Sequence, residues 1–272
     1  IGIGLSLGSS ISSGSCNIML GSGCTGNKIR TGNENILFGN CVGVGLSTGN
    51  CNIGIGRRAL QYVTSGNGNI GIGCRAGSHN SFFFGQDPKW TISIGEKSGV
   101  NALRNGVDNI FLGRGAGNNI AAGGVSTPND CANLGNILIG GSAGNSISPF
   151  EGGFCGNILM GYNTGFFGDH HPNDESYKLN VIIGHKAGRL LKGNCNVFLG
   201  SYAGESTTGF TNIGLGHSIL MPDQLGSNQL AIGQTSQYWI TGDQNFNVGI
   251  GTTIPTAQLD VNVGSSITAF NV

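Results

Sequence analysis

Proline and charge are scarce in this chain of 272 residues, and it has neither a C-x-x-C pair nor a long hydrophobic run. With only 6 prolines and no glycine at every third position, a collagen-like triple helix is excluded despite 52 glycines. Charged residues make up 10%, and the 13 basic and 13 acidic side chains cancel. We therefore expect no partnership with nucleic acid, and the lack of an apolar run of about 18 residues predicts no membrane insertion.

The 8 cysteines match no zinc spacing, and we predict neither a metal nor a cofactor. Cys16, Cys51 and Cys195 share one position of the repeat described below. We expect small buried thiols, with disulfide bonds as the alternative. The histidines of Asp169-His170-His171 are adjacent, so in an extended chain they point apart, which indicates a solvated loop tip.

A short repeat dominates the sequence, as comparison of GNCNIGIGRRAL with GNGNIGIGCRAG shows. Each copy has an Asn, an apolar triplet and a glycine that we call the anchor glycine, usually 16 to 18 residues after the previous one. A repeat this short without a helical apolar period is typical of a β-solenoid. We predict an all-β, parallel β-solenoid of about 14 coils over residues 1–251, followed by a connector at 252–272. The anchor glycines are Gly4, Gly21, Gly39, Gly56, Gly73, Gly95, Gly113, Gly140, Gly161, Gly184, Gly200, Gly216, Gly233 and Gly251.

Within the triplet, the first and third residues are large and aliphatic or aromatic, as in Ile36 and Phe38. Because residues two apart share a face of a strand, we expect this pair to fill the interior of the coil. The Asn before each triplet is expected to stack on its copies and to satisfy backbone groups at the corner. These asparagines are Asn17, Asn35, Asn52, Asn69, Asn109, Asn136, Asn157, Asn180, Asn196, Asn212 and Asn247.

The middle residue of the triplet is expected to face outward, yet it is apolar or very small and never charged. A strand that is apolar on both faces is covered on both sides. The chain has no helix to supply the cover, so we predict two further copies of itself, in a homotrimer. The predicted trimer interface consists of Met19, Leu37, Phe111, Leu138, Leu159, Ile182 and Phe198.

The motif N-I-x-I-G-x-x-A-G resembles the head repeats of trimeric autotransporter adhesins, which fold as left-handed parallel β-rolls. The stretch NVGIGTTIPTAQLDV at 247–261 is similar to the segment that precedes an endosialidase-type chaperone domain in phage tail fibres and bacterial surface proteins. This resemblance implies a structural segment of a viral tail fibre that mediates host attachment. A bacterial surface adhesin and a stalk without a ligand are the alternatives, so the expected location is a virion tail fibre or the cell surface.

Insertions at 78–94, 118–135, 146–156 and 166–179 interrupt the repeat and hold most of the aromatic residues. Aromatic faces beside polar groups suit a cell-surface glycan receptor. The structural alternative is that these residues cap the widened coils or pack between subunits. The candidate ligand-binding residues are Phe82, Phe83, Phe84, Trp90, Phe150, Phe154, Phe166, Phe167 and Tyr177.

We expect no enzymatic activity and assign no catalytic residue. The repeat lacks the aliphatic residue at every sixth position that hexapeptide acyltransferases require. A polysaccharide depolymerase needs paired carboxylates. Asp87 with Glu96, or Glu151 with Asp169 and Asp174, are the pairs that stacking of coils could bring together.

Overall fold

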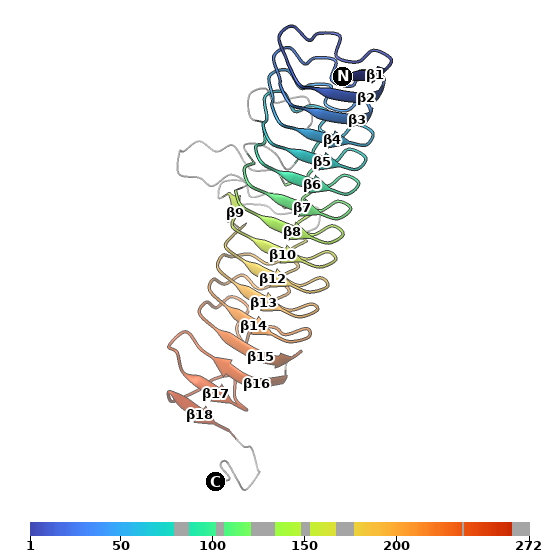
Figure 1. The fold of residues 1–272 in the computed structure, drawn as a ribbon. Coiled ribbons are helices and arrows are strands. Elements are labelled where there is room, and N and C mark those ends of the chain that lie inside the picture. The colour runs from blue at the N-terminus through green and yellow to red at the C-terminus, as the bar shows by residue number, and fades with distance from the viewer. Residues whose placement is uncertain are drawn as a thin grey trace.

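The computed structural model describes residues 1–78, 87–101, 106–120, 134–147, 153–166, 177–235 and 237–262. These residues form a rod-shaped parallel β-solenoid of about 11 turns, with the termini at opposite ends (Figure 1). The predicted all-β solenoid is confirmed, with fewer turns than expected. At the strand spacing of about 4.8 Å per turn, the rod is roughly 50 Å long. No helix occurs in the described part, and accordingly no helix there could cross a membrane.

Short strands that stack on one another along the rod build the main sheet, and each of them pairs in parallel with the next. These parallel strands are β1 (Gly2–Gly4), β2 (Ile18–Ser22), β3 (Ile36–Asn40), β4 (Ile53–Ile55), β5 (Ile70–Ile72), β6 (Ile92–Ile94), β7 (Ile110–Leu112), β8 (Ile137–Ile139), β10 (Ile158–Met160), β12 (Val181–Ile183), β13 (Val197–Leu199), β14 (Ile213–Leu215) and β15 (Leu230–Gln234). Triplets stack residue on residue, so that Phe111 pairs with Leu138 and Leu138 with Leu159.

The two faces of the strands are the reverse of the predicted ones. The middle residue of each triplet points into the coil, where Phe111, Leu138 and Phe198 are completely buried. The first and third residues lie on the outside and remain partly exposed. The predicted interface is therefore wrong for all seven residues, because each is buried inside its own chain: Met19, Leu37, Phe111, Leu138, Leu159, Ile182 and Phe198.

Asparagine decides which face is inside. Asn136 Nδ2 donates to Asn109 Oδ1 at 2.9 Å and to the Phe154 carbonyl at 2.9 Å, and its own Oδ1 accepts from Asn157 Nδ2 at 3.0 Å. The predicted Asn ladder is confirmed from Asn17 to Asn212, with Thr91 at the Asn position in one turn, where its N–H donates to Asn69 Oδ1. Asn247 bonds Asp243 instead. Since residues two apart share a face, a buried Asn places the middle of the triplet inside and the flanking residues outside.

Most turns pass through left-handed backbone before the Asn, two residues after the anchor glycine and again four residues after it, as at Gly77. Non-glycine residues occupy many of these corners, including Cys51 (φ 58°) and Arg58 (φ 61°). The anchor glycine itself has φ between 115° and 153° in β-solenoid turns such as those of Gly56 and Gly21. This region is essentially closed to residues with a Cβ, which explains why the anchor is always glycine.

Two further interior positions complete the core. The small residue three after the anchor glycine is buried, as Ala116 and Ala143 show. An apolar residue seven after the anchor is buried as well, a position that the sequence analysis did not identify although Leu46, Val63 and Leu191 recur there. The core consists of two clusters, from Met19 to Val63 and from Phe111 to Ala231. Between them the middle position holds only glycine or serine.

The regular turns end at β15, before residue 251. β16 (Gln237–Gly242) pairs antiparallel with β15, and β17 (Val248–Ile250) pairs antiparallel with β16. β18 (Leu259–Val261) then pairs in parallel with β17. Tyr238 packs on the larger core cluster, so this C-terminal hairpin covers the end of the solenoid. Gly251 therefore does not close a coil, which accounts for part of the difference in the number of turns.

Two of the predicted insertions contribute a small second sheet. β9 (Phe154–Cys155) pairs in parallel with β11 (Tyr177–Lys178). The rings of Phe154 and Tyr177 stack at 5.7 Å between centroids, inside the widened turns. Both side chains are buried, and burial raises the pKa of the Tyr177 hydroxyl. The described ends of these two insertions thus contribute side chains to the core of the solenoid.

Candidate interaction surfaces

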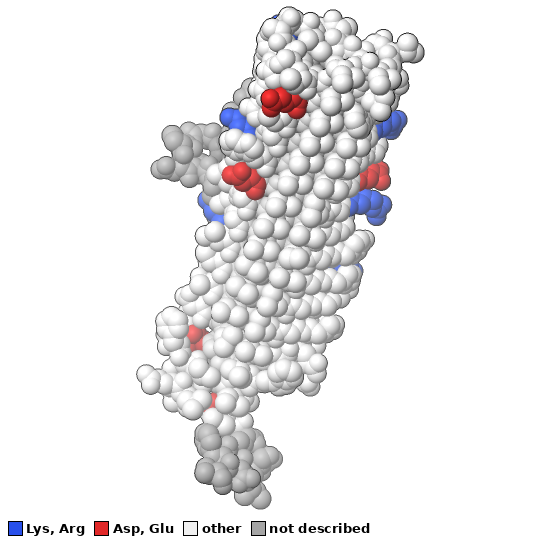
Figure 2. All heavy atoms as spheres, viewed as in Figure 1, with Lys and Arg blue, Asp and Glu red and all other residues white. Residues whose placement is uncertain are grey.

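The outer face of the main sheet is a continuous apolar strip made by the first and third residues of the triplets. Ile94 is 39% exposed, Ile183 38% and Ile213 43%. From β2 to β15 these two columns contain only Ile, Leu, Val, Phe and Met. Figure 2, in the same view as Figure 1, shows charged side chains along the margins of the rod and almost none between them. Soluble monomers rarely expose a long contiguous apolar surface.

Charged residues gather at the two ends of the strands. We call the residues just before each triplet and its Asn the entry edge, and those just after the anchor glycine the exit edge. Glu34, Lys89 and Asp108 lie exposed on the entry edge. The exit edge also carries exposed charges: Arg57, Glu96 and Arg114 directly follow an anchor glycine, and Arg75 and Lys97 come two residues after one.

Farther along the exit edge, aromatic and imidazole rings form a ladder from turn to turn. Tyr162 stacks on His185 at 5.8 Å, His185 meets Tyr202 edge to face at 5.3 Å, and Tyr202 lies 6.4 Å from His217. Lys186 Nζ lies 5.3 Å from the centre of the Tyr202 ring. The sequence analysis missed this ladder, because its residues are scattered and only stacking of turns brings them together. The rings pack against one another from turn to turn, which stabilises successive corners.

The predicted glycan-binding aromatics do not form one described patch. Phe154 and Tyr177 are buried, so their assignment to a ligand surface is wrong. Phe166 is half-buried, whereas Trp90 is 59% exposed on the entry edge. Phe82, Phe83, Phe84, Phe150 and Phe167 lie outside the described residues.

Cysteine side chains lie mostly at the surface, contrary to expectation. Cys16, Cys24, Cys51 and Cys195 are free and exposed. The small-thiol interpretation fails because three of these four precede a ladder Asn, where the chain turns outward at a left-handed corner. Cys155 is disulfide-bonded. The hydrogen bond to the Glu34 carboxylate raises the pKa of the Cys51 thiol, whose Sγ lies 3.3 Å from Glu34 Oε2.

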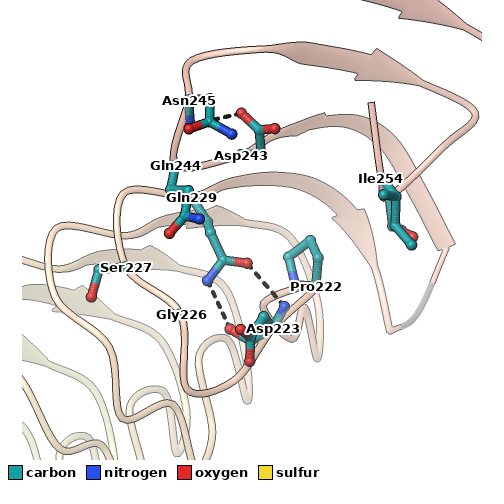
Figure 3. A pocket seen from close by; sticks show the side chains of 10 residues that line it. Pro222, Asp223, Gly226, Ser227, Gln229, Asp243, Gln244, Asn245 and Ile254 are labelled. Atoms are coloured by element: carbon teal, nitrogen blue, oxygen red, sulfur yellow. Dashed lines mark hydrogen bonds between the residues drawn. The ribbon is translucent and has the colours of Figure 1, made fainter. Parts of the chain in front are cut away.

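A hollow of about 350 Å³ lies between the last turn and the C-terminal hairpin (Figure 3). Asp223 and Asp243 lie on its walls, but both carboxylates already accept backbone hydrogen bonds. Asp223 Oδ1 accepts from Leu225 N at 2.9 Å, and Asp243 Oδ1 accepts from Asn247 N at 2.9 Å. The backbone hydrogen bond from Asn247 is the main reason why the pKa of Asp243 is lowered. The role of the two carboxylates is therefore to hold the loops, and no group of three potential metal ligands occurs among the described residues.

The carboxylate pairs of the depolymerase alternative are not brought together where they are described. Asp87 precedes β6 and Glu96 follows it, so they lie at opposite ends of one strand. Glu151, Asp169 and Asp174 fall outside the described residues. Asp87 instead bonds the previous turn: its Oδ2 accepts from Ser65 N at 2.6 Å and from Ser65 Oγ at 2.7 Å, and Thr64 donates to the same carboxylate.

We expect Asp87 to make the stability of the rod pH-dependent. Partial burial alone would raise the pKa of Asp87, but the hydrogen bonds from Thr64 and Ser65 outweigh it and lower the pKa. Its stabilising effect is full above the unfolded pKa of about 3.9 and is lost as the pH falls through the lower folded pKa. Asp87→Asn should lower the unfolding midpoint at pH 7 and reduce the loss of stability between pH 5 and 3. Thermal unfolding across that range measures both, with Glu205→Gln, which removes a carboxylate from a surface ion pair, as the control. Equal pH profiles for wild type and Asp87→Asn contradict the prediction.

Comparison with protein families, with curated proteins and with solved structures gives no match for this chain. The functional argument therefore depends on the geometry of its surfaces.

Proposed function

We propose that this chain is a rigid segment of a homotrimeric fibre, whose apolar outer face packs against two further copies of itself. The observation that carries the proposal is the uncharged apolar strip along the whole outer face of the sheet. The contact residues are now the flanking residues of the triplets, such as Ile94, Ile183 and Leu199, in place of the buried middle residues. Covering them removes apolar surface from water at about 25 cal/mol per Å².

Three copies around an axis are a closed arrangement in which each rod buries its apolar strip against the other two. The asparagine and glycine ladders make each rod stiff, because every turn hydrogen-bonds the next through backbone and side chain. A stiff trimer that displays three copies of each loop suits attachment, since threefold display multiplies weak contacts. This supports a fibre or adhesin, as the sequence resemblance implies.

The biological setting that we propose is a viral tail fibre that mediates host attachment, with left-handed winding of the coils. Multivalent glycan binding is the proposed mode of attachment, through Trp90 and the insertions. A bacterial surface trimeric adhesin shares every feature used here. A stalk without a ligand is the second candidate, favoured by the burial of Phe154 and Tyr177 in the solenoid.

Charged residues on the outer face should dissociate the assembly. Ile183 and Leu199 are paired neighbours on β12 and β13. The double variant Ile183→Glu/Leu199→Lys places opposite charges side by side, which spares the single chain like-charge repulsion. In the trimer these charges would be buried, at a cost of several kcal/mol, so association should weaken by more than about 100-fold. Native mass measurement and analytical ultracentrifugation report the change.

The matched control is Leu190→Glu/Leu225→Lys, which makes the same charge change at exposed leucines outside the sheet. We expect a trimer for wild type and control and a folded monomer for the outer-face variant, with unchanged circular dichroism. A monomeric wild type contradicts the proposal, and so does a trimer that tolerates charges at positions 183 and 199.

A further inference from the structure

We propose that copies of this chain associate parallel and in register, with the exit edge of each copy against the entry edge of the next; this inference rests on the proposed trimer. The observation behind this inference is that the two edges of the same turn bear opposite charges. The turn of β6 has Lys89 on its entry edge and Glu96 on its exit edge. The turn of β7 has the reverse, with Asp108 on the entry edge and Arg114 on the exit edge.

Backbone hydrogen bonds fix these four residues at defined heights along the rod. On the entry edge, Asp108 N donates to the Lys89 carbonyl at 3.2 Å. On the exit edge, Gly115 N donates to the Glu96 carbonyl at 2.9 Å. The two turns are thus direct neighbours at both edges, about 4.8 Å apart. All four side chains are exposed.

Nearer the N-terminus, a third pair of opposite charges lies on the entry and exit edges. The Glu34 side chain on the entry edge extends toward the turn of β4, because its Oε2 lies 3.3 Å from Cys51 Sγ. The exit edge of that turn carries Arg57, which is exposed. A neighbouring copy at equal height would therefore find a carboxylate facing a guanidinium, a favourable bidentate pair.

Within one chain these charges cannot meet. Lys89 and Glu96 are separated by an extended strand, on the order of 20 Å. The ion pair of the described part of the chain is Arg189 with Glu205, at 3.0 Å, and it involves none of these six residues. Their natural partners are the opposite edges of another copy.

The alternation of sign selects one register. If a neighbour were shifted by one turn, Glu96 would face Asp108, or Arg114 would face Lys89, and like charges would repel. Antiparallel pairing of exit edges would bring Arg57, Lys97 and Arg114 against basic residues of the second copy. Charge complementarity of this kind excludes wrong arrangements more than it adds affinity. A contact between two different edges is heterologous, and it closes into a ring when the rotation allows.

Carbodiimide cross-linking tests the arrangement, because it joins a carboxylate to an amine only where the two already touch. We expect covalent dimers and trimers of wild type that contain a Lys89–Glu96 linked peptide, which one chain cannot form across its strand. Lys89→Arg keeps the charge but removes the reactive amine, so this peptide should disappear while the native mass stays that of a trimer. A wild-type trimer that yields cross-linked chains but no Lys89–Glu96 peptide overturns the inference.

Charge reversal gives an independent measurement. Asp108→Arg places two arginines in each contact and should weaken association by about tenfold or more. Asp108→Arg/Arg114→Asp restores opposite charges and should recover the wild-type constant to within about threefold. The left-handed corner at position 108 accepts long side chains, as Trp90 and Leu179 show at its counterparts.

The outcomes separate this inference from the proposed function. A wild-type trimer whose affinity is insensitive to Asp108→Arg overturns the proposed pairing of charges between the two edges and leaves the trimer standing. The inference is also overturned if Asp108→Arg/Arg114→Asp does not regain the wild-type association constant although its circular dichroism is unchanged. A monomeric wild type overturns both.

Discussion

Gly113→Ala should unfold the middle of the solenoid or lower its free energy of unfolding by about 5 kcal/mol. Gly113 has φ 131°, a region that residues with a Cβ essentially do not enter, and this strain alone costs about 1–3 kcal/mol. A Cβ at this position would also lie 2.5 Å from the Gly140 carbonyl oxygen and 2.7 Å from its carbonyl carbon. The next turn would have to move away, which breaks hydrogen bonds of the main sheet. Circular dichroism during thermal unfolding and amide hydrogen exchange around β7 and β8 measure the effect.

Gly115→Ala is the matched control, two residues farther along the same turn. Gly115 has φ 67°, and the nearest atom to an added Cβ is Ser142 Oγ at 3.6 Å. The equivalent corners of other turns hold Arg58, Arg75 and Lys97 with φ of 61°, 59° and 55°. We therefore expect a cost of only about 1 kcal/mol. Equal destabilisation by the two substitutions would refute the special role of the anchor glycine.

Asn136→Leu should cost about 3–5 kcal/mol, although it keeps the branched shape and the number of heavy atoms of the side chain. Asn136 is completely buried, and its amide bridges three turns through Asn109, Phe154 and Asn157. Leucine leaves the Phe154 carbonyl and the Asn157 backbone N–H without this partner, and each buried unsatisfied group costs about 1–3 kcal/mol. Chemical denaturation measures the loss, and hydrogen exchange shows whether opening begins at β8.

Asn40→Leu is the control for this substitution. Asn40 is exposed on the exit edge, and its Nδ2 makes only long hydrogen bonds, of 3.4 Å to the Ser22 carbonyl and of 3.3 Å to Ser22 Oγ. A change within about 0.5 kcal/mol is expected there. If Asn136→Leu were as mild as Asn40→Leu, the ladder would not be what holds the turns together.

The spacing of anchor glycines sufficed to predict a stacked parallel β-solenoid, because a regular one-strand repeat has few other ways to bury its triplets. The Asn ladder was equally predictable, since identical residues in register necessarily stack. The candidate site was harder to predict from the sequence. Of the predicted ligand aromatics, Phe154 and Tyr177 are core residues of widened turns, a placement that depends on where β9 and β11 pair.

By itself, the sequence determined that both faces of each strand are apolar, so that one apolar face is left on the outside of the coil. Only the tertiary structure decided which face that is. Alternation with period two is symmetric between the faces, and the large flanking residues suggested the wrong one. The hydrogen bonds of a buried Asn broke the symmetry, because an amide that bridges neighbouring turns, as that of Asn136 does, lies inside and takes the middle residue with it. The pairing of charges at the strand ends likewise became visible only when stacking placed Lys89 beside Asp108 and Glu96 beside Arg114.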